Sequence, residues 1–331
     1  MPAQAQQVNC LEHQQVPGQV FDSDQPCVLR GLVSHWPVVE HAKESPQSLL
    51  SYLSELATAE PVTVYEVPAS AKGRVFYNQD LSGFNFSRGK APLAAVCDEL
   101  QRRSSEDDVL YVGSTLLDHW LPEFRSANDI DLQGREALVS LWLGGPARIA
   151  AHHDFPHNIA CNIGGRRRFT LFAPEQAKNL YIGPLDFTPA GQAISLVDFA
   201  NPDLEKFPRF AEAQAASIVI ELEPGDAIYI PSMWWHHVES LDQVNGLVNY
   251  WWRSTPVYHG SPSNALLHAI LAIKDLPDSQ RQIWQQMFDD YVFNADAESL
   301  EHIPEAARGI LNPVDEESAR ALKQQLTRFL K

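Results

Sequence analysis

Two short segments, far apart in the chain, carry side chains that bind metal ions. The first is HHDFPHN (His152 to Asn158), in which a histidine and an aspartate stand two residues apart. Residues i and i+2 of a β-strand point to the same face, so His152 and Asp154 would converge on one point while His153 faces away. Burying a carboxylate without a partner is costly, which favours metal binding over a purely structural role for this pair.

The second segment, EPGDAIYIPSMWWHHVESL (Glu223 to Leu241), offers a third ligand. A Pro-Gly-Asp turn leads into an apolar strand, and paired histidines, His236 and His237, stand at its far end. Two imidazoles and one carboxylate form the facial triad that suits non-haem iron(II) and leaves the opposite face open. Periodicity does not decide between His236 and His237 as the ligand. For His153 and His157 we expect the commoner role of a hydrogen-bonded core residue. We expect the same role for the histidine of the His236–His237 pair that does not bind the metal.

The stretch from about Ala137 to Arg253, which contains both segments, is dominated by short runs typical of β-strands. Gly, Pro and Asp separate the runs, as they do in an antiparallel sandwich or barrel. The runs are ALVSLWLG, RIAAHHD, NIACNIG, RRFTLF, SIVIELE, DAIYIP and GLVNYWW. We therefore expect a β core to hold the metal-binding side chains.

Helical and extended patterns alternate before this core. The runs CVLRGLVSHWPVV, PVTVYEV and DVLYVGST contain strand patterns, whereas SPQSLLSYLSELAT and PLAAVCDELQRR have helical spacing. Three helical segments follow Pro256, with Asn264 and Ser279 as candidate N-caps. The sequence thus predicts one domain over residues 1–256 and a helical region over residues 257–331. These last helices either fold back on the core or form a dimer interface, and their sequence does not distinguish between the two arrangements.

The composition limits the partners. With 331 residues, 44% hydrophobic and 20% charged, the chain is typical of a globular protein. Its formal charge of −17 repels phosphate backbones, so a nucleic-acid partner is not expected despite the run Arg166-Arg167-Arg168. No apolar run is long enough to cross a bilayer, so no membrane partner is expected.

The N-terminus and the cysteines indicate a reducing compartment. The segment MPAQAQQVNC lacks a basic region followed by an apolar one, so it does not resemble a secretory signal. The four cysteines are widely spaced and form no CxxC pair, which favours reduced, structural thiols. We therefore expect a cytoplasmic protein.

Taken in chain order, these motifs resemble the JmjC/cupin-like family of 2-oxoglutarate oxygenases, and most closely its asparaginyl hydroxylases. The resemblance implies a mainly β fold, with a double-stranded β-helix (cupin or jelly-roll) core, N-terminal α/β elements and a C-terminal helical tail that often makes dimers in this family. It runs from Val109 to Trp252. The matching stretches are VLYVGSTL, HHDFPHN, GRRRFTLFAPEQ, VDFANPDLEKFPRF, EPGDAIYIPSMWWHHVESL and VNYWW.

The resemblance also assigns roles to single residues. It implies that His152, Asp154 and His236 bind the iron, and that no catalytic side chain is needed beyond these ligands. It implies that 2-oxoglutarate is bound by Tyr111, Asn158, Arg167, Asn249 and Trp251. Arg167 stands where the nearest relatives have lysine, a change that keeps the charge needed to bind the distal carboxylate. Ile149 stands where the family has a hydroxyl, so one contact to the cosubstrate is lost or supplied by another group.

The implied activity is hydroxylation with iron(II), 2-oxoglutarate and O₂, which releases succinate and carbon dioxide. A protein or peptide side chain is the first candidate substrate, and a small metabolite is the second. Two other functions remain open: a metal-binding cupin enzyme that does not use 2-oxoglutarate, and a cupin-like binding module without catalysis.

Overall fold

The computed structural model describes residues 5–11, 14–189, 191–296 and 298–330. The first four residues of the N-terminal segment considered above lie outside the described residues. The chain divides into two compact units, one ending at Arg253 and the other beginning at Ser254. No helix in the described part of the chain is long and apolar enough to span a membrane.

The core of the first unit is a double-stranded β-helix, as predicted. Its eight strands form two facing antiparallel sheets, with the order β12-β9-β14-β7 in one and β11-β10-β13-β8 in the other. The strands are β7 (Leu138–Gly144), β8 (Arg148–His153), β9 (His157–Gly164), β10 (Arg167–Phe172), β11 (Ile218–Leu222), β12 (Ala227–Ile230), β13 (Trp235–Ser240) and β14 (Asn245–Trp252). Consecutive strands mostly alternate between the sheets, so segments distant in sequence become neighbours.

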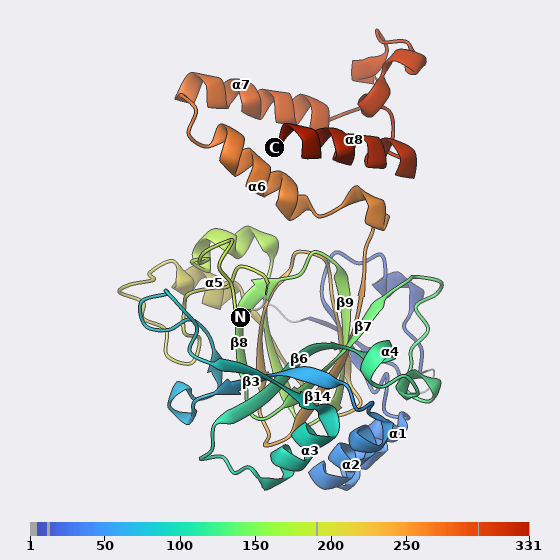
Figure 1. Ribbon diagram of the computed structural model, residues 1–331, viewed down its shortest axis with the longest axis vertical. Helices are drawn as coiled ribbons and strands as arrows, with labels where there is room; N and C mark the ends of the chain where they lie inside the picture. Colours follow the sequence, from blue (N-terminus) through green and yellow to red (C-terminus); the bar gives the residue numbers. More distant parts are fainter. Residues whose placement is uncertain (1–4, 12–13, 190, 297, 331) are drawn as a thin grey trace. The chain divides into compact units, whose positions relative to one another are not determined.

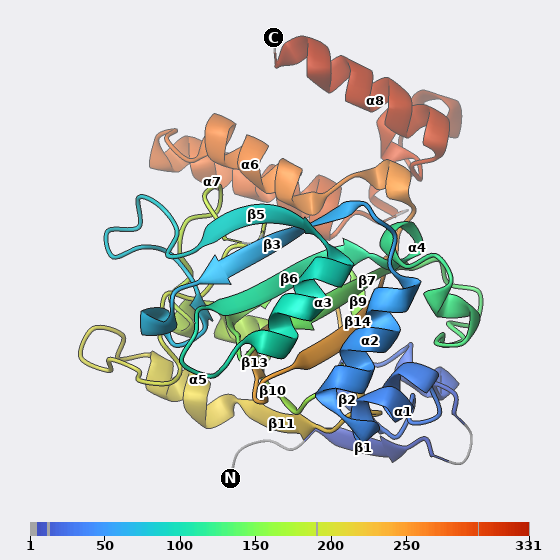
Figure 2. The ribbon, with the colours of Figure 1, turned by 60° about the horizontal axis from the view of Figure 1, so that its bottom comes forward.

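N-terminal strands extend the first sheet to nine strands and helices cover its outer face (Figures 1 and 2). The added strands are β1 (Gln6–Asn9), β2 (Cys27–Arg30), β3 (Pro61–Val67), β5 (Ser87–Pro92) and β6 (Val109–Leu116). The covering helices are α1 (Pro37–Glu44), α2 (Pro46–Leu56) and α3 (Leu93–Arg102). Ser45 caps α2 by accepting from the Ser48 amide, and proline follows at the first helical position. The shorter elements are β4 (Arg74–Val75), beside β8 in the smaller sheet, α4 (Leu117–Trp120) and α5 (Phe210–Ala216).

The alternation of side chains along β14 separates two environments. Val248 and Tyr250 point outward and pack with the helix residues of the largest hydrophobic cluster. Leu247 points inward and packs with Phe169 and Leu171 of β10 between the sheets. Asn249 shares the inward face because it lies two residues from Leu247. The interior of the barrel therefore receives polar side chains from the same strand that builds the dry outer core.

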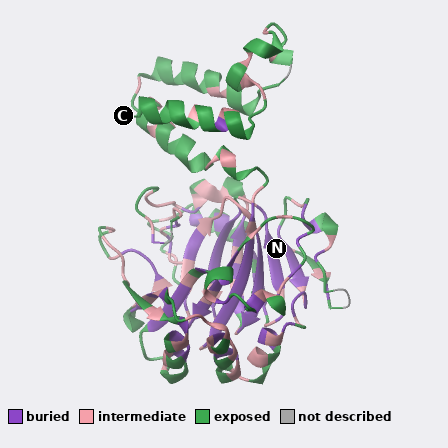
Figure 3. Ribbon diagram, turned by 45° about the vertical axis from the view of Figure 1, so that its right-hand side comes forward, coloured by how far each residue is buried: buried purple, intermediate pink, exposed green. Residues whose placement is uncertain are grey.

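The second unit consists of α6 (Pro262–Ile273), α7 (Asp278–Phe288), α8 (Glu316–Phe329) and short turns of helix. The predicted N-caps are wrong: Ser261 caps α6 and Pro277 precedes α7, so Asn264 and Ser279 lie inside the first turns. Proline at or before the first helical position starts both helices earlier than the apolar pattern indicates. Large apolar side chains, such as Leu271 and Phe329, are mostly exposed in this unit (Figure 3).

Candidate metal centre

The two histidines predicted as ligands lie opposite each other on neighbouring strands. His152 of β8 pairs directly with His236 of β13, and their ring centroids are 4.3 Å apart. Directly opposed residues of an antiparallel pair point to the same face, so both rings enter the barrel. We expected His236 at the far end of the apolar strand β12. Instead, the turn Pro231–Trp234 separates β12 from β13, and His236 lies near the start of β13.

Backbone carbonyls fix both imidazoles. His152 Nδ1 lies 2.9 Å from the Ala150 carbonyl oxygen, and His236 Nδ1 lies 3.1 Å from that of Trp234. A carbonyl only accepts, so each Nδ1 carries the proton and each Nε2 keeps a lone pair free for a metal. Burial, with a smaller contribution from His152, lowers the pKa of His236 to about 4. The ring is therefore neutral at physiological pH, as a metal ligand must be.

Asp154 completes the group from the turn after β8. Its Oδ2 lies 3.6 Å from His236 Nε2 and accepts a hydrogen bond of 3.2 Å from the indole of Trp251. One ligand atom from each of His152, Asp154 and His236 lies within 4.8 Å of the others. Two imidazoles and a carboxylate at this separation can hold one iron(II) ion and leave coordination positions free. The donor set therefore fits the metal that the resemblance implies.

Arg167 is a buried cation without a carboxylate partner. Its side chain lies on the inward face of β10 and is 4% exposed. Nε has no hydrogen-bond partner, and among the residues that the structure describes no aspartate or glutamate pairs with this guanidinium. Its neighbours differ: Arg166 pairs with Asp242 and Arg168 with Glu221 on the outside. Burial lowers the pKa of Arg167 to about 10, which still leaves it charged at neutral pH.

Tyr111 lies beside Arg167. This phenol of β6 is buried, and burial raises its pKa while the charge of Arg167 opposes that rise. The phenol is therefore protonated at neutral pH and can donate a hydrogen bond. A guanidinium and a phenol in a closed interior together suit a carboxylate that enters from outside the chain.

The predicted amides lie on neighbouring strands, Asn158 on β9 and Asn249 on β14. Asn158 lies directly opposite Trp251, and Asn249 directly opposite Ser140 of β7. Three buried polar atoms here have no hydrogen-bond partner: Asn158 Oδ1, Asn249 Nδ2 and Ser140 Oγ. Buried polar groups are rarely left without partners, so this part of the sheet is suited to a polar ligand. The resemblance provided no signal for Ser140.

Ile149 faces the interior and cannot replace the hydroxyl of the family. It packs with Tyr111 and Trp142 as well as with the core between the sheets. The pairing of β8 with β13 shifts register between His236 and Val238, so β8 holds one residue more than its partner there. This bulge brings Ile149 to the same side as His152, although they are three residues apart.

The remaining histidines of the two segments pack against aromatic rings, but the predicted hydrogen bond is absent at the buried Nδ1 atoms of His153 and His237 among the residues that the structure describes. His153 packs edge-on against Trp235, and His237 lies 4.6 Å from the Phe199 ring, both outside the barrel. Burial lowers the pKa of His237 to about 3. His157 stacks on the Trp252 ring, and its Nδ1 lies 2.9 Å from the Tyr229 hydroxyl. In the described part of the chain, none of the three belongs to the metal-binding group.

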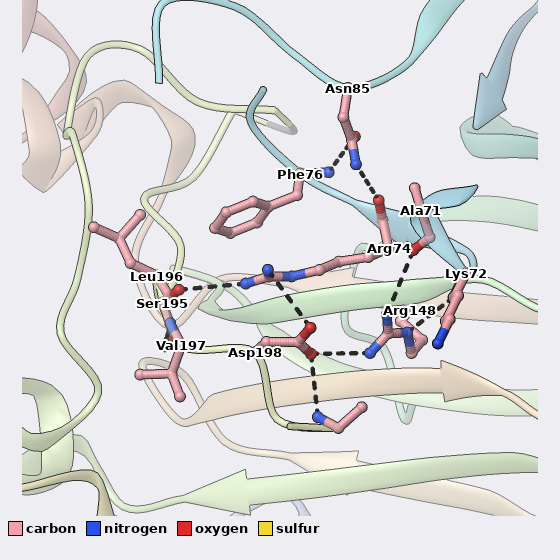
Figure 4. Close-up of polar contacts among 11 residues, drawn as sticks. Ala71, Lys72, Arg74, Phe76, Asn85, Arg148, Ser195, Leu196, Val197 and Asp198 are labelled. Carbon is pink, nitrogen blue, oxygen red and sulfur yellow. Dashed lines mark hydrogen bonds and ion pairs between the residues drawn. The ribbon is translucent and has the colours of Figure 1, made fainter. Parts of the chain in front are cut away.

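A charged cluster holds the outer edge of β8 (Figure 4). Asp198 lies between two half-buried arginines, 2.9 Å from Arg148 of β8 and 3.8 Å from Arg74 of β4. The amide of Ser195 also donates to the carbonyl of Ala151. The loop that contains the matching stretch VDFANPDLEKFPRF is thus attached to the strand that carries His152.

Comparison with known proteins places the chain in a family. Residues 14–258 match the family described as cupin-like domain. JmjC domain-containing protein D of Dictyostelium discoideum is 29% identical over 235 residues, or 66% of this chain and 49% of that protein. Jumonji C domain-containing protein 5 of Drosophila melanogaster is 26% identical over 70% of this chain and 55% of its own length. Lysine-specific demethylase JMJ31 of Arabidopsis thaliana is 34% identical over 35% of this chain and 21% of its own. The chain spans about half the length, or less, of these curated relatives.

Proposed function

This chain belongs to the cupin-like, JmjC-type family of 2-oxoglutarate oxygenases, and from that premise we propose that it is an iron(II)- and 2-oxoglutarate-dependent oxygenase. The proposed reaction is hydroxylation of a protein or peptide side chain, with a small metabolite as the second candidate. Closeness to the asparaginyl hydroxylases and a cytoplasmic location stay predictions.

The observation that carries this proposal is the unpaired guanidinium of Arg167. A buried cation is unfavourable unless an anion compensates it, and this chain supplies no carboxylate there among its described residues. A dicarboxylate such as 2-oxoglutarate suits this position, because its distal carboxylate can pair with Arg167 while its other end reaches the metal-binding group. A cupin that binds metal alone has no use for this cation.

Each part of the interior has a separate task in the proposed reaction. His152, Asp154 and His236 would hold iron(II), and Arg167 with Tyr111 would bind the distal carboxylate of the cosubstrate. Bound iron(II) and 2-oxoglutarate would supply the oxidising power, by activating O₂ as the cosubstrate loses carbon dioxide to form succinate. Asn158 and Asn249 would orient the metal-binding end of the cosubstrate. Ile149 and the surrounding aromatic rings would exclude water from the bound cosubstrate.

Anaerobic titration with iron(II) and 2-oxoglutarate separates this proposal from its two alternatives. A chelated 2-oxo acid gives a weak visible charge-transfer band, which should form with the wild-type chain and be absent with His152→Ala. Turnover by the iron-loaded chain without such a band would favour a cupin enzyme that needs no 2-oxoglutarate. Absence of both the band and turnover would favour a binding module. Succinate release screened against peptide pools and metabolites then identifies the substrate.

We also propose that the C-terminal helices form a homodimer. In this unit Ala319 is the one buried residue among those described, while Leu271, Ile283 and Phe293 are 76%, 61% and 72% exposed. Exposed apolar side chains in this number are suited to an interface, and a second copy carries the same side chains. Light scattering after size exclusion should give a dimer, and Leu271→Glu with Ile283→Glu should give a monomer. A monomeric wild-type chain would contradict this proposal.

A further inference from the structure

Trp142 of β7 connects several of the predicted cosubstrate residues, although neither the motifs nor the resemblance assigns it a role. We infer that Trp142 is a positioning residue: its indole N–H holds the amide of Asn249 so that the Nδ2–H group of Asn249 faces the cosubstrate as a donor. This inference rests on the proposed function and concerns the same site.

The hydrogen bond between the two side chains fixes which way the amide points. Trp142 Nε1 lies 2.6 Å from Asn249 Oδ1. An indole N–H only donates, so the amide atom that it contacts must be the oxygen. The amide nitrogen of Asn249 is then on the other side, where it is buried and has no partner. A buried donor without an acceptor is costly, and a carboxylate or keto oxygen of the cosubstrate would satisfy it.

Aromatic neighbours on two sides hold the indole itself in place. The Trp142 ring lies 6.2 Å from the ring of Tyr111 and 5.9 Å from that of Trp251, centroid to centroid. Tyr111 is the phenol beside Arg167, and Trp251 donates to the metal-binding carboxylate Asp154. Trp142 therefore lies between the two ends of the proposed cosubstrate site.

The backbone of Asn249 is held in the sheet, so the one remaining freedom of its amide is rotation of the side chain. Its strand is paired on both sides, with Ser140 of β7 and Ala160 of β9 directly opposite. Rotation of the amide by half a turn would exchange Nδ2 for Oδ1 and present an acceptor to an anionic ligand. The donor of Trp142 opposes that rotation, because it would face Nδ2 instead of an oxygen. Losing this donor should thus weaken cosubstrate binding without removing any ligand of the metal.

The test is Trp142→Phe, which keeps an aromatic ring and removes the N–H group. We expect the dissociation constant of 2-oxoglutarate, measured anaerobically from the charge-transfer band and by calorimetry, to rise about tenfold. Iron(II) stoichiometry and affinity without 2-oxoglutarate should not change. Trp120→Phe is the matched control, because the Trp120 indole nitrogen is buried without a partner and packs in the outer cluster. This control should bind 2-oxoglutarate as the wild type does.

A second variant tests the other end of the hydrogen bond and does not depend on the folding of Trp142→Phe. Asn249→Asp keeps an acceptor for the indole and replaces the inward donor with an oxygen, so it should also lose affinity for 2-oxoglutarate, by at least tenfold. Asn249→Ala combined with Trp142→Phe should be no weaker than Asn249→Ala alone, because the indole acts through the amide. Wild-type affinity in Trp142→Phe or Asn249→Asp, or additive losses in the double variant, would overturn the inference. Absence of 2-oxoglutarate binding to the wild type would instead overturn the proposed function.

Discussion

Trp251 donates its indole N–H to Asp154 across the interior of the barrel, with 3.2 Å between Nε1 and Oδ2. Trp251 belongs to the larger sheet, whereas Asp154 follows β8 of the smaller sheet. The carboxylate of the metal-binding group is thus oriented by the sheet opposite the one that carries both histidines. The resemblance predicts that Trp251 lines the cosubstrate pocket; its observed contact is with the carboxylate predicted to bind iron.

Trp251→Phe should lower the affinity for iron(II). The variant keeps an aromatic ring but leaves Asp154 without its donor, and the loss of such a partner of a metal ligand commonly costs 10- to 100-fold in metal affinity. Competition with a coloured chelator measures the change. Equal iron affinity in the variant and the wild type would show that this hydrogen bond does not orient the carboxylate.

His236→Ala should abolish stoichiometric iron binding, and His237→Ala is its matched control. The two histidines are adjacent, but the ring of His237 packs on Phe199 outside the barrel. Iron content after anaerobic loading distinguishes them. If His237→Ala lost the iron and His236→Ala kept it, the choice of ligand would be wrong.

Removing the metal should also lower the melting temperature of the wild type. Iron(II) at about 100 times its dissociation constant adds about 2.7 kcal/mol to the free energy of unfolding. For a unit of this size, that corresponds to about 5–10 °C. Thermal unfolding with iron(II) and with a chelator measures the difference, and His236→Ala should show no such difference. A shift of equal size in that variant would place the stabilising metal elsewhere.

Arg167→Ala should raise the dissociation constant of 2-oxoglutarate about 30-fold or more, because it removes the cation that pairs with the distal carboxylate. Arg167→Lys should recover most of the affinity, since it restores the charge without the bidentate geometry. Arg168→Ala is the control: this side chain faces outward and pairs with Glu221. Iron binding should persist in all three. An unchanged 2-oxoglutarate affinity in Arg167→Ala would remove Arg167 from the site.

Asp198→Asn should destabilise the first unit. Without the carboxylate, Arg74 and Arg148 lose their shared counter-charge while both stay half-buried. We expect a loss of about 1–3 kcal/mol, or about 3–10 °C in melting temperature. Thermal unfolding monitored by circular dichroism measures it, with Glu205→Gln, an exposed residue of the same loop, as control. A melting temperature equal to that of the control would show that the cluster contributes nothing to stability.

The sequence predicted those parts of the fold that depend on local pattern. Strand runs such as PVTVYEV coincide with strands, and helical spacing after Ser45 coincides with α2. The pair His152 and Asp154 was suggested by period-two alternation and the cost of burying a carboxylate, although β8 ends at His153 and Asp154 follows it. Helix starts were missed where proline begins the helix before its apolar pattern does, as at Pro262.

The parts of the site that depend on pairing between distant strands were beyond a single sequence. Periodicity did not choose between His236 and His237, because both occur on one strand and the choice depends on which face of that strand points into the barrel. Trp142 and Ser140 carry no motif; their place opposite β14 gives them their surroundings. By its pattern Arg167 is one member of a basic run, and the resemblance alone gave it a role; in the structure it differs from its neighbours by its burial without a carboxylate partner among the described residues.

The extra residue in β8 has a consequence for alignment and engineering. The number of residues between Ile149 and His152 matters for function, because together with the bulge it decides which side chains enter the barrel. On a strand of plain alternation, residues three apart face opposite sides, so straightening β8 at unchanged chain length would turn Ile149 outward, even with every amino acid unchanged. Grafting a hydroxyl at position 149 is therefore meaningful only in a host that preserves this odd spacing.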